Sequence, residues 1–332
     1  MPHACYAEVE AGSHRELGEA LGGRFGTIAA DGIDYVRGEG GWKRKVAAAR
    51  DLLERTRAVF PHYAEELEAY AAAARLPVLD LWVLMVEDDL GPMAGEKCTT
   101  VVTNGGKLLS HNEDWDSDSE DAICVLKKTL RGFTTLEIYY YNNVLGGTAI
   151  TVNSNGCVQA INSLSPTDVQ PGVPRNVVAR WLSETADVEA DVRKLAGMQR
   201  SSGYNHLFTD MRGEVFNLEC SATRQVLTRP QLPYAHTNHF LCRELQHLDE
   251  GREEDATVDR HRSACALLKE NMTLGEMVAL NSDTSRGRQR SIMNARTIGK
   301  LVVDLERRIA SIWLRREKSA GWIDYPLDFI GD

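Results

Sequence analysis

Apolar residues in the first ninety positions recur at steps of three and four, the spacing of amphipathic helices. Ser13 and Glu16 have the spacing of a capping box, so we expect a helix to begin there. The same steps continue through residues 42–74, where Pro61 is expected to end one helix and open the next. Residues 79–84 extend the pattern. The first part of the chain is therefore predicted to be helical.

From Cys98 onward the pattern changes to short β-type runs separated by turn residues. Residues 99–103 and 107–111 flank Asn104-Gly105-Gly106, which predicts a β-hairpin. Further strands are expected at residues 122–126, 134–141, 148–152, 158–161, 206–210, 215–220, 225–228, 297–305 and 309–314. The sheet is thus expected to begin at the cysteine.

The second half of the chain also contains helical and loop segments. Residues 163–174 are rich in Ser, Pro, Gly and Asp and predict a loop, either a flap over a pocket or an ordinary surface connection. Helices are expected at 177–195, 260–269 and 274–280. This order of elements favours an α+β fold of antiparallel sheet layers covered by helices over alternating βαβ units.

Composition narrows the class of protein. The chain has 332 residues, 43% of them hydrophobic, which suffices for a substantial core. Its formal charge of -10 and lack of a basic block argue against nucleic-acid binding. The N-terminus carries no export signal, and no apolar run has the length of a membrane span. The seven cysteines are odd in number and form no C-x-x-C pair, so we expect reduced thiols in the cytoplasm.

Cys98 is the first candidate for chemistry. A free cysteine usually packs in a core, but this one begins the first predicted strand and could project from its end into a cleft. If the chain were cut before Cys98, the new α-amine would titrate near neutral pH, at about 7.7 to 8.0. It could then accept the thiol proton without a histidine.

Other groups of residues suggest metal sites or catalytic motifs, but each lacks a required partner. Counted from Asp114, a calcium loop would need Gly at 119 and Glu at 125, where Ser119 and Val125 stand. His236, His239 and Cys242 suggest zinc, but the chain offers no second ligand pair at a recognisable spacing. Serine-hydrolase and nucleotide-binding motifs are absent from the sequence. We therefore expect no metal and no cofactor.

Several segments, in this order and spacing, carry a resemblance to a known family. They are Ser13-His14-Arg15-Glu16-Leu17-Gly18, Cys98-Thr99-Thr100, His111-Asn112-Glu113-Asp114-Trp115, Asn153 to Gly156 leading to Asn162, Pro171-Gly172-Val173-Pro174 before Arg180, Asn217-Leu218-Glu219-Cys220-Ser221, His236-Thr237-Asn238-His239, Asp259-Arg260-His261-Arg262 and Asp304. The chain resembles the acyl-coenzyme A:6-aminopenicillanic acid acyltransferase family almost end to end. Members of that family are self-cleaving N-terminal nucleophile (Ntn) hydrolases with an αββα four-layer fold.

The resemblance implies a site and a division of the chain. Cleavage between Lys97 and Cys98 would separate a helical small chain, 1–97, from a catalytic large chain, 98–332, which together form one compact domain. Cys98 would be the nucleophile and Asn238, a neutral donor, would stabilise the oxyanion. Asp114 corresponds to a carboxylate beside the nucleophile, and Ser221 to a serine linked to processing. Asn162 corresponds to a polar wall position.

Three departures from the family pattern bear on function. Lys97 stands where the family often has Gly, and a bulkier residue limits the backbone conformations of the scissile peptide. Asn294 stands where the fungal acyltransferase carries an arginine, which Arg290 or Arg296 could replace in space. The chain ends Phe329-Ile330-Gly331-Asp332, which is not a peroxisomal address.

The sequence thus predicts a cytoplasmic cysteine amidohydrolase or acyltransferase that works through an acyl-enzyme thioester. Its substrate would be an N-acyl amide or acyl thioester of a small amine or amino-acid-derived molecule. Water is favoured slightly over an amine as the acceptor, and acyl-CoA is a possible donor although no coenzyme A signature is visible. The alternative is an unprocessed, non-catalytic homologue that binds a small ligand, for which Lys97 is the best support.

Overall fold

A computed structural model describes residues 1–90, 97–115, 119–249 and 256–331. Its N-terminal helices begin where the sequence predicts. The Ser13 side chain caps the first helix by accepting from the Glu16 backbone N–H at 3.2 Å, while the Glu16 carboxylate accepts from the Gly12 N–H at 2.8 Å. Pro61 opens the third helix. The helices are α1 (His14–Gly38), α2 (Trp42–Val59), α3 (Pro61–Ala74) and α4 (Val78–Met85), followed by the 3-10 turn η1 (Glu87–Asp89).

Eight strands form the larger sheet, in the order β1-β4-β5-β6-β7-β8-β9-β10. They are β1 (Ala7–Ala11), β4 (Ile123–Leu130), β5 (Phe133–Tyr140), β6 (Ile150–Asn153), β7 (Val158–Ser163), β8 (Tyr204–Thr209), β9 (Val215–Cys220) and β10 (Gln225–Thr228). The expectation that the sheet begins at Cys98 is wrong, because β1 precedes the helices and pairs in parallel with β4. Its alternation of buried and exposed residues is that of an edge strand.

Six strands form the second sheet, in the order β11-β2-β3-β12-β13-β14. They are β2 (Lys97–Thr103), β3 (Leu108–Asp114), β11 (Tyr234–His236), β12 (Thr297–Asp304), β13 (Ile309–Leu314) and β14 (Ile323–Pro326). The predicted hairpin is confirmed, since β2 and β3 pair antiparallel across residues 104–107. Gly106 has φ +85°, and a Cβ there would lie 2.4 Å from the Gly213 carbonyl oxygen. That close approach joins the turn to the other sheet.

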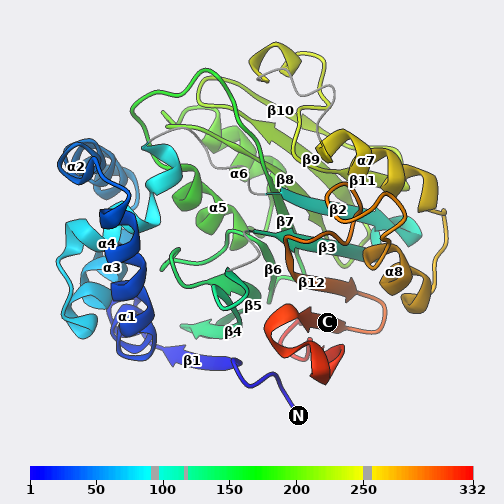
Figure 1. The fold of residues 1–332 in the computed structure, drawn as a ribbon, viewed down its shortest axis with the longest axis horizontal. Helices are drawn as coiled ribbons and strands as arrows, with labels where there is room; N and C mark the ends of the chain where they lie inside the picture. The colour runs from blue at the N-terminus through cyan, green and yellow to red at the C-terminus, as the bar shows by residue number, and fades with distance from the viewer. Residues whose placement is uncertain (91–96, 116–118, 250–255, 332) are drawn as a thin grey trace.

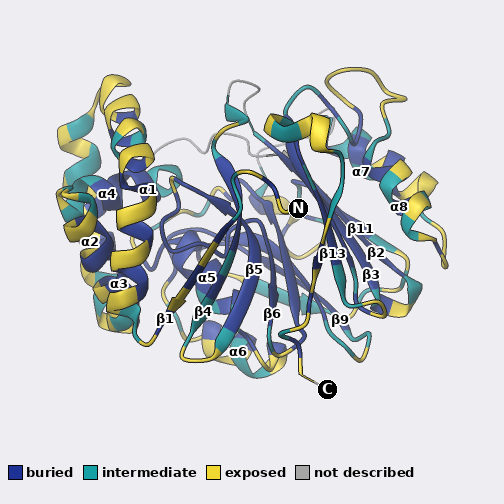
Figure 2. Ribbon diagram, turned by 90° about the horizontal axis from the view of Figure 1, so that it is seen from below, coloured by how far each residue is buried: buried dark blue, intermediate teal, exposed yellow. Residues whose placement is uncertain are grey.

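The two sheets face each other, and helices cover both outer sides (Figures 1 and 2). Apolar residues of β4, β5, β12 and β13 fill the space between the sheets. The outer side of the larger sheet packs on α1–α4 and on α5 (Arg175–Ser183) and α6 (Val188–Leu195). The outer side of the smaller sheet packs on α7 (Ala256–Leu267) and α8 (Leu274–Asn281). The predicted αββα four-layer α+β fold is confirmed.

One predicted helix is divided. Residues 177–195 were expected to be continuous, but α5 ends at Ser183 and α6 starts afresh after Asp187, whose side chain accepts from the Ala190 N–H at 2.9 Å. A new cap makes a new helix. Within the described residues, no helix is both long enough and apolar enough to cross a membrane.

Candidate active site

The hairpin β2–β3 places Cys98 between the two sheets. Cys98 pairs with Glu113, and four residues away on each strand Val102 pairs with Leu109. Side chains two or four residues apart on a strand share a face. Since Val102 and Leu109 belong to the core between the sheets, the Cys98 and Glu113 side chains point to that side as well. Cys98 is only 2% exposed.

A series of buried polar contacts begins at the Cys98 thiol. The thiol lies 3.6 Å from Glu113 Oε1, which also accepts from the Tyr140 hydroxyl at 2.7 Å. The other carboxylate oxygen of Glu113 lies 2.7 Å from His111 Nε2. Nδ1 of His111 in turn lies 2.8 Å from the Thr100 hydroxyl. No role was predicted for Glu113 and His111, yet the register of the hairpin brings both side chains to the same face of the sheet as the thiol.

The backbone of Cys98 is held by two side chains from distant parts of the chain. Its N–H donates to Asn238 Oδ1 at 2.8 Å, and its carbonyl accepts from Arg260 Nη1 at 2.6 Å. Arg260 also donates to Asn238 Oδ1 at 2.8 Å and to the Thr99 hydroxyl at 2.9 Å. The three residues therefore fix one another. Arg260 is fully buried in α7, and the sequence showed it only as part of a family segment.

Asn238 joins Cys98 to the opposite sheet. It follows β11, and its amide nitrogen donates to the carbonyl of Ser163, the last residue of β7, at 3.0 Å. Its own N–H donates to the Thr257 hydroxyl at 2.8 Å. The side-chain NH₂ has two hydrogens. One amide hydrogen of Asn238 is used for Ser163, and the second could donate to an oxyanion, as predicted.

Asn162 lies on the wall that faces the nucleophile. It is on β7, whose residues Val158 and Ala160 point into the core between the sheets, so its side chain has the same direction. Its Oδ1 accepts from Asn205 Nδ2 at 3.2 Å. In the described part of the chain, its buried Nδ2 has no hydrogen-bond partner. A buried donor without a partner is costly, which makes this nitrogen a candidate donor to a bound oxygen.

Asp114 lies beside the predicted cleavage site but faces the helices. It pairs with Lys97 in the ladder, one position after Glu113, so its side chain points to the other side of the sheet. Its carboxylate accepts from Asn294 Nδ2 at 2.7 Å and from the Thr297 hydroxyl at 2.6 Å. Burial raises the pKa of Asp114, and the positive charge of Arg260 opposes that rise.

Arg290 and Arg296, the two arginines expected to replace the family's arginine, have contacts with other described residues. Arg290 pairs with Asp259 at 2.7 Å, and Arg296 donates to the Trp115 carbonyl at 3.1 Å. Arg260, by contrast, acts electrostatically on Asp114 and contacts the nucleophile's backbone. Arg260 therefore supplies a positive charge between Asp114 and the backbone of Cys98.

Ser221 belongs to a different cluster. Its hydroxyl donates to Asp168 Oδ2 at 2.8 Å, and the Thr223 hydroxyl donates to the same oxygen. Burial disfavours the charge of Asp168, but the hydrogen bonds from Thr223 and Ser221 outweigh it and lower the pKa. Asp168 is in the predicted loop 163–174. These contacts tie that loop to the end of β9.

The chain matches a known protein family over most of its length. A model of the family described as acyl-coenzyme A:6-aminopenicillanic acid acyl-transferase matches residues 101–318, more than half of the chain. The chain belongs to this family. The match spans Asp114, Asn162, Ser221 and Asn238 and begins just after Cys98. No curated protein matches the chain.

Solved structures show weaker likeness. Penicillin V acylase from Agrobacterium tumefaciens is 15% identical, with a TM-score of 0.44 over 66% of this chain and 83% of that one. Conjugated bile acid hydrolase from Clostridium perfringens is 12% identical, with a TM-score of 0.47 over 71% of this chain and 94% of that one. The assignment to the family therefore rests on the sequence match.

Two cavities bear on the location of the site. A small one, about 40 Å³, lies at Tyr140 and Trp115 and is bordered by polar residues that include Asp88 and Asn143. Tyr140 connects it to Glu113 and so to the thiol. Through Tyr140, this cavity is one hydrogen bond away from Glu113, the carboxylate beside the thiol.

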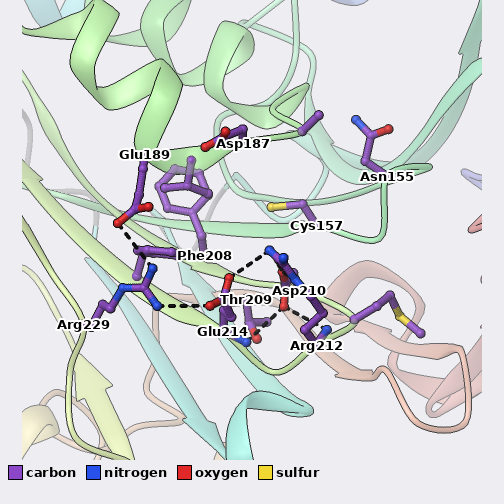
Figure 3. Close-up of a pocket in the computed structure, with 14 residues that line it drawn as sticks. Asn155, Cys157, Asp187, Glu189, Phe208, Thr209, Asp210, Arg212, Glu214 and Arg229 are labelled. Carbon is purple, nitrogen blue, oxygen red and sulfur yellow. Dashed lines mark hydrogen bonds and ion pairs between the residues drawn. The ribbon is translucent and has the colours of Figure 1, made fainter.

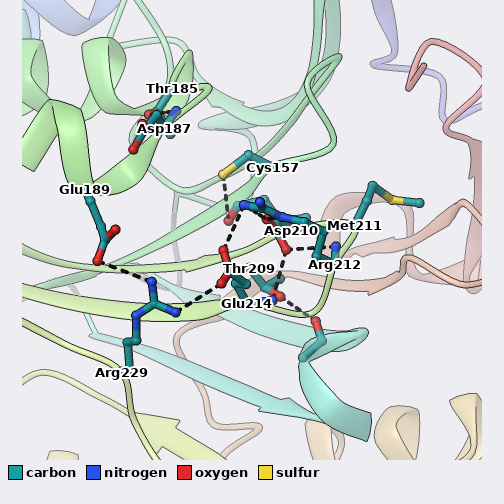
Figure 4. Close-up of polar contacts among 12 residues, drawn as sticks. Cys157, Thr185, Asp187, Glu189, Thr209, Asp210, Met211, Arg212, Glu214 and Arg229 are labelled. Carbon is teal, nitrogen blue, oxygen red and sulfur yellow. Dashed lines mark hydrogen bonds and ion pairs between the residues drawn. The ribbon is translucent and has the colours of Figure 1, made fainter. Parts of the chain in front are cut away.

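A larger cavity, about 620 Å³, lies elsewhere, on the outer side of the larger sheet (Figure 3). Arg229 bridges Glu189 and Glu214 across it, and Arg212 joins Asp210 to Glu214 (Figure 4). Its only thiol among the lining residues is Cys157, whose pKa burial raises to about 12. A thiol that does not ionise is a poor nucleophile. The thiol that lines the larger cavity is thus a poor nucleophile.

His236 and Cys242, two of the residues considered for zinc, lie at a buried carboxylate. His236 Nε2 lies 2.9 Å from Glu219 Oε1, and the Glu219 carboxylate also accepts from the N–H groups of Leu241 and Cys242. Burial raises the pKa of Cys242 to about 11, so a thiolate is disfavoured there. His236 and Glu219 hold the turn after β11, where Asn238 lies.

Proposed function

We propose that the protein is a self-processing cysteine acylase with Cys98 as its nucleophile. The observation that carries the proposal is the convergence on Cys98. Asn238 holds its backbone N–H, Arg260 holds its backbone carbonyl, and Asn162 offers an uncommitted donor on the facing wall. A buried thiol that served only as core filler would need no such support. Membership in a family of acyl-transferases supports acyl transfer as the chemistry.

Self-processing would proceed by an N-to-S acyl shift. The Cys98 sulfur attacks the Lys97 carbonyl carbon, the C–S bond forms as the C–N bond breaks, and the thiol proton ends on the new α-amine. Water then hydrolyses the thioester, which frees the thiol and leaves a carboxylate on Lys97. In the intact chain, Asn238 Oδ1 already accepts from the nitrogen that becomes this amine.

Turnover would use the same groups. The α-amine of Cys98 takes the thiol proton, and the thiolate attacks the carbonyl of an N-acyl amide or acyl thioester. Asn162 Nδ2 and the second amide hydrogen of Asn238 donate to the oxyanion. One such donor typically contributes about a hundredfold or more in rate. Asp114, whose side chain points to the other face of the sheet, would act on this site through Arg260, which interacts with its charge and donates to the Cys98 carbonyl.

The substrate is an acylated small amine or amino-acid-derived molecule, with water as the favoured acceptor and an amine or acyl-CoA thioester as further partners. The polar lining of the cavity at Tyr140 suits a molecule with hydrogen-bonding groups. The cysteines are free thiols, which is compatible with the cytoplasm. Nucleic acid and membranes are not proposed as partners.

A specific observation keeps a second candidate, a non-catalytic homologue that binds a small ligand. Cys98 is only 2% exposed, and Lys97 replaces the expected small residue before it. The two candidates differ in one measurable respect, turnover that depends on the thiol.

The test is a screen of N-acyl amino acids and acyl-CoA thioesters with product detection by mass spectrometry. Wild type is compared with Cys98→Ala and, as a matched control, with Cys265→Ala at an exposed thiol. We expect product from wild type and Cys265→Ala and none from Cys98→Ala. Retained turnover in Cys98→Ala would refute the mechanism, and no turnover of any substrate would favour the ligand-binding candidate.

A further inference from the structure

Three different ligand types converge at the buried end of the β2–β3 hairpin. Cys98 offers Sγ, His111 offers a ring nitrogen and Glu113 offers a carboxylate oxygen, and these atoms all lie within 4.8 Å of one another. We propose that this cluster binds a divalent ion of the zinc type and that the bound ion masks the Cys98 thiol. The binding stands on geometry alone. Only its consequence, reversible inhibition, rests on the proposed function.

The spacing of the ligand atoms is close to what a tetrahedral ion requires. Zinc binds sulfur at about 2.3 Å and nitrogen or oxygen at about 2.0–2.2 Å, so neighbouring ligand atoms lie roughly 3.3–3.7 Å apart. The 3.6 Å between Cys98 Sγ and Glu113 Oε1 already meets this spacing. The 2.7 Å between His111 Nε2 and Glu113 Oε2 must lengthen by less than about 1 Å. The ligand atoms of Cys98 and His111 lie within 4.8 Å of each other, so this third distance must shorten by about 1 Å at most.

Outer hydrogen bonds orient two of the ligands. The Thr100 hydroxyl lies 2.8 Å from His111 Nδ1, so a proton on Nδ1 donated to Thr100 leaves Nε2 with its lone pair toward the ion. The Tyr140 hydroxyl donates to Glu113 Oε1 at 2.7 Å and fixes that carboxylate. Such outer hydrogen bonds are typical of metal sites, where they fix the orientation and tautomer of the ligands.

Charge and ligand type select the kind of ion. The thiolate and the carboxylate together carry two negative charges, which a divalent ion neutralises in an interior where an unbalanced charge is costly. The thiol must lose its proton to solvent as the metal–sulfur bond forms. Sulfur and imidazole ligands favour zinc, or cobalt as its substitute, over calcium and magnesium.

The experiment uses the full chain with metal alone. Purified protein is freed of metal with a chelator, then titrated with Zn²⁺ by calorimetry and with Co²⁺ by absorption, since a thiolate on cobalt gives an intense near-ultraviolet charge-transfer band. Wild type is compared with Cys98→Ala, His111→Ala and Glu113→Gln. His239→Ala is the matched control, because His239 is a partly buried histidine that contacts Thr237 and Thr257 outside the cluster.

We expect one Zn²⁺ per wild-type chain, a thiolate–cobalt band that Cys98→Ala abolishes, and at least tenfold weaker binding in His111→Ala and Glu113→Gln. His239→Ala should bind as wild type does. Zinc binding that Cys98→Ala leaves unchanged, or a cobalt spectrum without the thiolate band, would overturn the proposal.

A second measurement on wild type alone covers the case in which a buried variant does not fold. Alkylation by iodoacetamide is followed for each cysteine by peptide mass spectrometry. Zn²⁺ should slow alkylation of Cys98 at least tenfold and leave that of the exposed Cys265 unchanged. Equal rates with and without Zn²⁺ would overturn the site. Loss of turnover in Cys98→Ala together with failed zinc binding would reject this site and leave the proposed function intact.

Discussion

Replacing Arg260 with methionine tests the support of the nucleophile. The substitution keeps much of the side-chain volume but removes the donors to the Cys98 carbonyl, the Thr99 hydroxyl and Asn238 Oδ1. It also removes the positive charge that opposes the raised pKa of Asp114. Removing one partner from a buried charged cluster typically costs about 3–5 kcal/mol. We expect a loss of that order in the free energy of unfolding.

The matched control lies two residues further along α7. Arg262 is 65% exposed and pairs with Asp259 at 3.8 Å, so Arg262→Met should cost less than about 1 kcal/mol. Arg260→Lys keeps the positive charge but offers one compact ammonium to three acceptors. Its loss in the free energy of unfolding should lie between those of Arg260→Met and Arg262→Met. In Arg260→Met, the negative charge of Asp114 loses its positive partner. Adding Asp114→Asn should therefore recover part of the lost stability, with a coupling free energy between the two substitutions of about 0.5–3 kcal/mol.

Urea unfolding followed by circular dichroism supplies the free energies, and turnover is measured in parallel. Misplacing the Cys98 backbone by about 1 Å should lower turnover on the order of a hundredfold. If Arg260→Met were as stable as Arg262→Met and turned over substrate at the wild-type rate, the contacts of Arg260 with Cys98, Thr99 and Asn238 would have no role in either folding or catalysis.

Three further predictions concern Asn162, the association of the two chains after cleavage, and the pH dependence of stability. Asn162→Ala should lower turnover about a hundredfold with little change in KM, whereas an unchanged rate would remove Asn162 from the oxyanion site. After cleavage, the two chains should co-elute in size-exclusion chromatography because Arg175 pairs with Asp88 at 3.0 Å and Asn176 donates to a carbonyl of α4; separate elution would contradict this. Burial raises the pKa of Asp89 from 3.8 to about 6, against the opposing charge of Arg175, so the folded state holds the proton more tightly than the unfolded state. Relative to Asp89→Asn, wild type should therefore lose about 3 kcal/mol of stability between pH ~4 and pH ~6 and no more above that range, as followed by urea unfolding at each pH; parallel curves would refute the shift.

Local signals predicted most of the elements. The Ser13 cap, the break at Pro61 and the turn at residues 104–106 each follow from the residues at that point, and the structure contains all three. The edge strand β1 was missed because its partner, β4, lies far along the chain. Five residues that alternate apolar and acidic positions are a weak signal without that partner.

The candidate site shows a sharper limit of sequence. Glu113 and Asp114 are adjacent, and only the register of the hairpin decides which of them shares a face with Cys98. A slip of one residue would exchange them. Family resemblance drew attention to Asp114, while the register brings Glu113 to the thiol. Arg260 reaches Cys98 from α7, and nothing local in the sequence fixes a contact over that separation.

The most direct test of Cys98 as a self-released nucleophile is the intact mass of the purified protein after long incubation. Wild type should give two chains that meet between Lys97 and Cys98, and Cys98→Ala should stay whole. A wild-type chain that remains a single species of 36.9 kDa would contradict self-processing.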